Sequence, residues 1–234
     1  MKTQLNWQLG FTRDPQQPPT KFIPATVPGA VQLDWARTHD WPQPEYDPDL
    51  SKYAWMEDVY WLYKTQLVFE LDAGEHLFFV CKGVDYQFEI RLNGETLHEQ
   101  EGMFTPVELD LTEKVKPGDT LGVLVFPAPK SCATPVDRTQ ANQSCKPAVA
   151  YGWDFHPRLI PLGIWDEAVL EVRAERYLAS AVHASSCTQH SGKRKPLNNS
   201  PRVATPRPSR SKSMAALFLQ KGAIGSRPAC SLAR

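Results

Sequence analysis

Apolar and polar residues alternate with a period of two along several stretches of the first 175 residues. The longest alternating series is Trp61, Tyr63, Thr65, Leu67, Phe69 and Leu71. Because successive side chains of a strand point to opposite faces, this spacing predicts one long, half-buried strand over residues 61–71. Trp7, Leu9 and Phe11 repeat the pattern and predict a first strand within residues 5–11.

Further short strands are expected between residues that favour turns. Asn93-Gly94 tolerates the positive φ angles of a type I′ hairpin turn, and a Pro-Gly pair at 117–118 indicates another tight turn. A short helix is expected at 31–35, whereas prolines keep 41–50 irregular. The remaining strands are expected at residues 77–81, 86–92, 96–99, 107–111, 121–126 and 168–173.

The order of these elements predicts an all-β fold. Seven or eight short strands with turns every 8–15 residues are typical of an antiparallel sandwich or barrel. The chain shows no alternation of strands with helices and no internal repeat.

One long segment, residues 127–160, has no clear periodicity and contains several prolines. A loop of this length in a compact domain is usually either functional or disordered. It gathers Tyr151, Trp153, Phe155 and His156 within six residues, which favours an ordered loop that contacts another molecule or domain.

Charge divides the 234-residue chain into two parts. Residues 176–234 contain 11 Lys and Arg and no acid, so residues 1–175 hold 15 Lys and Arg (26 − 11) against 26 acids. All seven Trp occur at or before position 165, so the core belongs to residues 1–175. The basic, Ser/Pro/Arg-rich tail cannot bury enough apolar surface to order itself.

Three interpretations of residues 176–234 stay open. The loss of all acids after Glu175 is what a shifted reading frame produces, and this interpretation is favoured. A plain disordered tail comes next. A tail that binds nucleic acid or an anionic surface is the third, and nucleic acid is therefore not an expected partner.

Several classes of site have no support in the sequence. The five Cys form no Cys-x-x-Cys pair, and no catalytic Ser, zinc-binding or phosphate-binding motif is present, so no metal or cofactor is expected. Glu57, Asp58, Glu99 and Glu101 have no spacing that marks a catalytic carboxylate pair. Without an apolar leader or a membrane-spanning stretch, we expect no membrane partner and, by default, a cytoplasmic location.

Several segments, in one order across residues 5–173, carry a resemblance to a known family. They are Val-Pro-Gly-Ala-Val at 27–31, Trp-Leu-Tyr-Lys at 61–64, Gly-Val-Asp-Tyr at 83–86, Leu-Asn-Gly-Glu at 92–95, Glu-Gly-Met-Phe-Thr-Pro at 101–106, Tyr-Gly-Trp-Asp-Phe at 151–155 and Leu-Gly-Ile-Trp at 162–165. Together they resemble the N-terminal domain of family 2 glycoside hydrolases of the β-mannosidase/β-galactosidase type. The last two resemble the mannosidase-like branch most closely.

This resemblance implies a galactose-binding-domain-like jelly-roll β-sandwich over residues 1–175. In full-length members an immunoglobulin-like sandwich follows, and then a (β/α)₈ barrel that supplies two catalytic glutamates for a retaining mechanism. The resemblance ends near Val172, and the last 62 residues are too few for a barrel of about 200–250 residues. We therefore expect a truncated hydrolase fragment, with no catalytic residue and no activity alone. The alternatives are a stand-alone glycan-binding module and a scaffold for a separate catalytic chain.

The resemblance also implies two substrate-binding residues. Asp154 would accept hydrogen bonds from sugar hydroxyls, although a loop Asp can instead cap its own turn. Trp153 would pack on a sugar ring or on the barrel, unless it is a local core residue. The implied partners are a β-mannoside or β-galactoside and the missing catalytic domains. The surface that those domains would cover is expected to expose apolar patches, through which copies of the chain associate.

Overall fold

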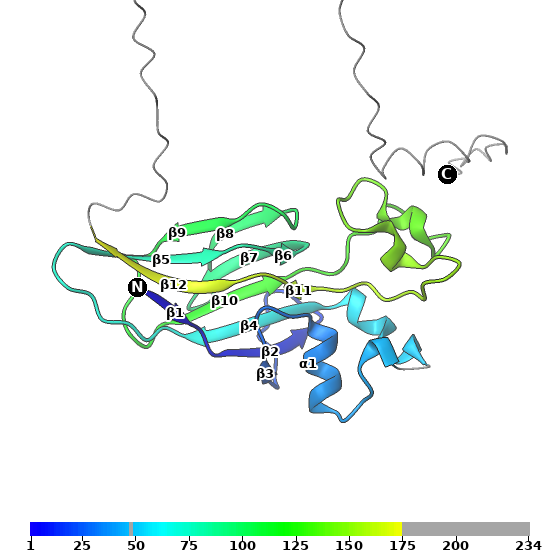
Figure 1. Cartoon of the computed structure of the whole chain (residues 1–234), viewed down its shortest axis with the longest axis horizontal. Coiled ribbons are helices and arrows are strands. Elements are labelled where there is room, and N and C mark those ends of the chain that lie inside the picture. The colour runs from blue at the N-terminus through cyan, green and yellow to red at the C-terminus, as the bar shows by residue number, and fades with distance from the viewer. Residues whose placement is uncertain (47–48, 175–234) are drawn as a thin grey trace, which may run out of the picture. The chain divides into compact units, whose positions relative to one another are not determined.

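The computed structural model describes residues 1–46 and 49–174, and antiparallel strands dominate it (Figure 1). In order across the first sheet lie β1 (Lys2–Gln4), β12 (Ala168–Ala174), β5 (Glu75–Cys81) and β9 (Val107–Asp110). The second sheet has the order β3 (Ile23–Ala25), β2 (Trp7–Thr12), β4 (Tyr60–Gln66), β10 (Thr120–Val125), β7 (Gln87–Leu92) and β8 (Glu95–Glu101). A small third sheet pairs β6 (Val84–Asp85) with β11 (Gly163–Ile164).

The core lies between the two large sheets. Trp7 of the six-stranded sheet packs edge-on against Phe79 of the four-stranded sheet, with ring centroids 6.3 Å apart. Along β4 and β5 the buried side chains alternate with more exposed ones, as two facing sheets require. The expected all-β antiparallel sandwich is therefore confirmed.

Short helices cover one end of the sandwich. The predicted helix is present as α1 (Val31–Thr38), and it continues three residues beyond the expected end. Within the stretch expected to be irregular, 41–50, the described residues form the 3₁₀ turn η1 (Pro44–Tyr46), and a longer 3₁₀ helix begins at Leu50. Three further 3₁₀ helices are η2 (Leu50–Asp58), η3 (Arg138–Ala141) and η4 (Ala148–Tyr151).

The hairpin between β7 and β8 forms as the sequence predicts. Asn93 and Gly94 have φ angles of 51° and 96°, the two positive values of a type I′ turn. The Asn93 side chain also accepts a hydrogen bond from the backbone N–H of Thr120, at 2.9 Å. This bond ties the turn to the neighbouring strand β10.

The single long strand expected over residues 61–71 is wrong in its extent, because β4 ends at Gln66. Its neighbour β10 begins at Thr120, directly after the tight turn, so beyond Gln66 there is no strand to pair with. The Leu67 N–H instead bonds the carbonyl of Asp119 at 2.8 Å. Phe69 and Leu71 still pack on the core, which explains why their spacing resembles that of a strand.

Two predictions concern residues that the structure does not describe. The boundary at residue 175, and with it the division into domains 1–175 and 176–234, stays a prediction. The three interpretations of the basic tail also lie outside the described residues.

Candidate functional site

The segment 127–160, expected to be ordered, follows β10 and lies at the end of the sandwich that carries α1 (Figure 1). Backbone bonds attach its start to η2, because the Ala128 N–H donates to the carbonyl of Glu57 at 2.8 Å. At its end, the Gln32 side chain of α1 donates to the carbonyl of Ile160 at 2.8 Å. The loop is therefore fixed at both ends to helices that sequence periodicity alone would not bring together.

A buried ion pair holds the middle of the loop to β6. The ammonium of Lys146 lies 2.6 Å from the carboxylate of Asp85, and both side chains are almost fully buried. Lys146 also donates to the carbonyl of Pro161 at 2.8 Å. Burial raises the pKa of Asp85 and lowers the pKa of Lys146, and in each case the partner's charge opposes that shift.

A second charged cluster anchors the loop to η2. The guanidinium of Arg158 makes a bidentate contact with the Glu57 carboxylate, with its shortest N–O distance 2.6 Å. The same carboxylate lies 2.7 Å from the ammonium of Lys130, which also contacts Asp58 at 2.6 Å. The Glu57 carboxylate thus forms ion pairs with two cations, an arrangement suited to positioning the loop rather than to proton transfer.

The predicted residue Asp154 lies in a tight turn near the C-terminal end of the segment 127–160. The turn is closed by two backbone bonds between Trp153 and His156, of 2.8 and 3.2 Å. The Asp154 side chain is exposed, and its carboxylate accepts no hydrogen bond from any residue that the structure describes. Capping of its own turn therefore has no hydrogen bond to support it among these residues.

The second predicted residue, Trp153, is not a core residue. Its side chain is 41% exposed, and the guanidinium of Arg138 lies 3.7 Å from its ring centroid. Arg138 belongs to η3, whose first turn is capped by the Asp137 carboxylate. The next aromatic residue, Phe155, is 81% exposed. The turn thus carries an exposed carboxylate that is next in sequence to two exposed aromatic side chains.

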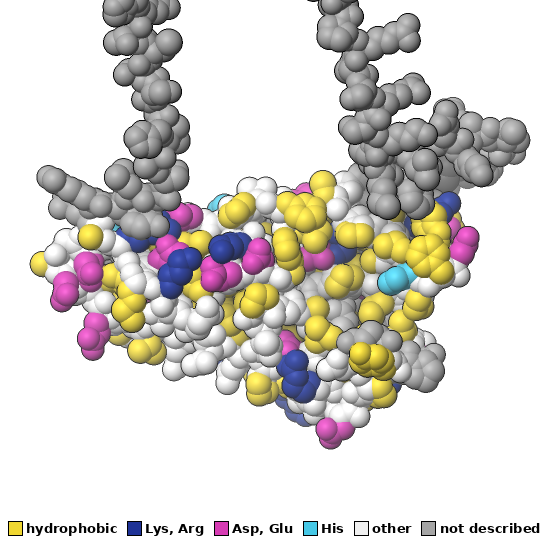
Figure 2. Space-filling view, viewed as in Figure 1, with side chains coloured by type: hydrophobic (Ala, Val, Ile, Leu, Met, Phe, Trp, Pro, Cys, Tyr) yellow, Lys and Arg dark blue, Asp and Glu magenta, His cyan; other side chains and the backbone are white. Residues whose placement is uncertain are grey.

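Other exposed aromatic side chains lie outside the loop. Phe104 packs edge-on against Trp165, with centroids 5.9 Å apart, and the Trp165 indole donates to the carbonyl of Met103 at 2.9 Å. Figure 2 shows hydrophobic side chains gathered at the end of the domain that carries the loop. The association that the sequence predicts for such a surface stays a prediction.

Neither a metal-binding cluster nor a membrane-spanning helix occurs among the described residues. In residues 1–46 and 49–174, no three His, Cys, Asp or Glu side chains are grouped so that they could hold a metal ion. Within the same ranges no helix has the length and hydropathy needed to cross a bilayer.

The sequence does not identify the residues whose ion pairs hold this turn in place. No motif or spacing in the sequence gives Lys146, His156 or Arg158 a role, and Glu57 stands out only as an acid without the spacing of a catalytic pair. Lys146 and Asp85 are 61 positions apart, and Arg158 and Glu57 are 101 apart. No periodicity marks a partner at such a separation.

A family model described as the glycosyl hydrolase 2 galactose-binding-like domain matches residues 7–166. The chain belongs to this family. The match covers the whole six-stranded sheet, the loop 127–160, and β5 and β9 of the four-stranded sheet, so the resemblance expected from the sequence is confirmed for this domain.

Distant relatives agree with this assignment. The chain is 24% identical over 204 residues to β-mannosidase B of Thermothelomyces thermophilus, covering 81% of this chain and 23% of the relative. It is 26% identical over 170 residues to the β-mannosidase of Mus musculus, covering 64% and 19%. The chain thus spans about a fifth of the length of these relatives.

Solved structures share the fold. A β-D-mannosidase from Dictyoglomus thermophilum superposes with a TM-score of 0.60 at 23% identity, over 74% of this chain and 22% of that one. The exo-chitosanase of Amycolatopsis orientalis gives a TM-score of 0.55 at 18% identity, over 74% and 21%.

Proposed function

We propose that this domain is the non-catalytic, sugar-facing part of a glycoside hydrolase that acts on β-mannosides or β-galactosides. The observation that carries the proposal is the exposed Asp154 carboxylate, held on a tightly anchored turn beside Trp153. The β-mannosidase relatives support the choice of substrate class.

The turn suits recognition of a sugar. A carboxylate can accept hydrogen bonds from two hydroxyls at once, and charge-assisted bonds are stronger than neutral ones. The open part of the Trp153 ring offers an apolar surface to the C–H groups of a pyranose. Ion pairs with Asp85 and Glu57 hold Lys146 and Arg158, which lie on either side of Asp154 in the sequence. Because the loop is held in this way without a ligand, the entropic cost of binding is lower.

The domain alone is not expected to hydrolyse a glycoside. Retaining hydrolysis needs two carboxyl groups about 5–5.5 Å apart, one acting as acid/base and one as nucleophile. Near the turn, Glu57 and Asp58 are both bound to Lys130. We therefore propose that catalytic carboxylates come from other domains of the enzyme, and that Asp154 completes their pocket.

An assay of the purified 234-residue chain tests the catalytic part of this proposal. With 4-nitrophenyl β-mannoside and β-galactoside we expect no release of nitrophenol above a heat-denatured control. Turnover at about 1 s⁻¹ or faster, in the range usual for enzymes, would overturn it.

A second candidate function is a stand-alone glycan-binding module. The exposure of Trp153 and Phe155 on one turn favours it, because binding modules use open aromatic rings to stack on sugars. Calorimetric titration with manno- and galacto-oligosaccharides separates the candidates. Saturable binding that Asp154→Asn and Trp153→Ala each abolish favours the binding module. A titration with no heat of binding favours the part of a larger enzyme. The variant Asn142→Ala, elsewhere on the same loop, is the matched control.

A further inference from the structure

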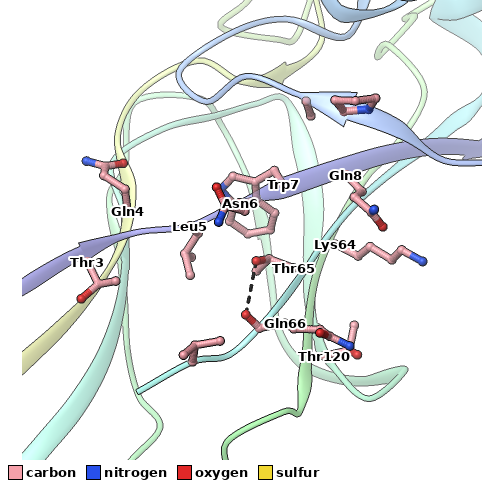
Figure 3. Close-up of a pocket in the computed structure, with 13 residues that line it drawn as sticks. Thr3, Gln4, Leu5, Asn6, Trp7, Gln8, Lys64, Thr65, Gln66 and Thr120 are labelled. Carbon is pink, nitrogen blue, oxygen red and sulfur yellow. Dashed lines mark hydrogen bonds between the residues drawn. The ribbon is translucent and has the colours of Figure 1, made fainter. Parts of the chain in front are cut away.

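A separate cavity lies where the chain passes from one large sheet to the other (Figure 3). Its walls come from β1, β2, β3, β4 and the start of β10. It shares no residue with the loop 127–160. Figure 1 shows β1 and the final residues of β4 toward the end of the sandwich away from that loop.

Incomplete strand pairing creates this cavity. The pairing of β2 with β4 stops at Gln8 and Lys64, whereas the pairing of β4 with β10 continues to Gln66 and Thr120. The last residues of β4 therefore have a strand partner on one side only. Strand β1 pairs with β12 alone among the described strands. The cavity is thus bordered by two strand edges whose outer sides are open.

The side chains that line the cavity are mostly neutral and polar. They contribute hydroxyl and amide groups that can donate and accept hydrogen bonds; these residues include Thr3, Gln4, Asn6, Gln8, Gln66 and Thr120. No Asp or Glu is among the lining residues, so a divalent cation has no charged ligand there. The single lining cation, Lys64, places its ammonium 3.5 Å from the centroid of the Phe22 ring.

Trp7 adds a hydrogen-bond donor without an acceptor. Its side chain lines the cavity, yet only 5% of it is exposed because the ring also packs against Tyr63 and Phe79. Its Nε1 has no hydrogen-bond partner among the described residues. A buried donor of this kind is costly, and Nε1 itself is closed to solvent, so the indole N–H is a neighbour of the cavity whose signal would respond to a ligand bound there.

We propose that this cavity binds a neutral saccharide, as a second sugar site independent of the Trp153–Asp154 turn. Amide and hydroxyl side chains match the alternating donors and acceptors of sugar hydroxyls. Leu5, Pro24 and Val68, also in the lining, face the C–H groups of the ring. A sugar held here would keep a longer glycan attached to the domain while its other end is free.

Nuclear magnetic resonance of the ¹⁵N-labelled 234-residue chain tests the proposal. The probes are cellobiose and β-1,4-mannobiose, added up to millimolar concentrations. We expect a saturable shift of the Trp7 indole N–H signal, which a Trp7→Phe variant identifies by its disappearance. Asn6→Ala combined with Gln66→Ala removes two exposed contacts and should weaken binding roughly tenfold or more.

Matched variants make the result decisive. Gln16→Ala removes an exposed glutamine outside the cavity and should leave the affinity unchanged. If neither sugar shifts any indole or backbone N–H signal, the second site is wrong, whereas the function proposed for the loop is unaffected. Binding that only Asp154→Asn abolishes also overturns it. A response to the tripeptide Thr-Val-Thr, with none to either sugar, would instead identify the open strand edges as a peptide site and overturn the saccharide assignment.

Discussion

Replacing Lys146 by methionine tests whether the buried ion pair holds the loop. Methionine keeps much of the side-chain length but removes the charge, which leaves the Asp85 carboxylate buried without its cation, 2.6 Å away in the native domain. Removing one partner of a buried pair costs about 3–5 kcal/mol. For a domain of this size, such a loss lowers the melting temperature by roughly 6–20 °C.

The loss should depend on pH, and its direction follows from Asp85. Burial already raises the pKa of Asp85, and without Lys146 the pKa rises further. An unfolded Asp titrates near pH 3.9, so between that pH and the raised value the folded variant holds a proton that the unfolded chain releases. The variant is therefore least impaired below about pH 4 and loses stability as the pH rises through the raised pKa.

Urea unfolding of both proteins from pH 4 to pH 8 measures this difference directly. The comparison uses the difference between variant and native protein at each pH, because other carboxylates destabilise both in acid. Adding Asp85→Asn to Lys146→Met removes the unpaired charge and should recover part of the loss. A difference that stays below about 1 kcal/mol at pH 7, or does not change with pH, would refute the reasoning. Hydrogen exchange should show the loop 127–160 opening first, since Lys146 also binds Pro161.

Four further outcomes are expected. Gly163→Ala should destabilise the domain by about 1–3 kcal/mol in urea titration, because its φ is 131° and an added Cβ would lie 2.5 Å from the Tyr63 hydroxyl; Gly74→Ala, with open space around it, is the control for the added methyl. Burial raises the pKa of the Cys81 thiol to about 12, so iodoacetamide at pH 8 should alkylate the exposed Cys145 in the native protein and leave Cys81 unmodified until the protein unfolds. Trp153→Ala should change the free energy of unfolding by less than about 1 kcal/mol, because the ring is partly exposed and has the Arg138 guanidinium over its face. A larger loss would show that Trp153 acts as a core residue. Sedimentation should show concentration-dependent association that Phe155→Ser weakens; a chain that stays monomeric at high concentration would contradict the role given to its exposed aromatics.

The sequence predicted the strands whose apolar residues alternate over five or more positions. Strands β2 and β7 occur close to where periodicity placed them, and β5 and β10 occur where short apolar segments between turns predicted them. Strands β1, β3, β6 and β11 have two or three residues each, which is too short for a period of two to be visible. The error at residues 67–71 has a different cause. Alternation reports which side chains are buried, and Phe69 and Leu71 are partly buried without a neighbouring strand to pair with.

The candidate site also has one part that the sequence predicts and another part that it does not. Trp153 and Asp154 are adjacent in the sequence, so a short motif was enough to single them out. Their support comes from β6 and η2, and only the folded chain brings Asp85 to Lys146 and Glu57 to Arg158. The position of the Asp154 carboxylate therefore depends on residues that no local pattern connects to it. A substitution in η2 or β6 should displace this turn as effectively as a change within the loop itself.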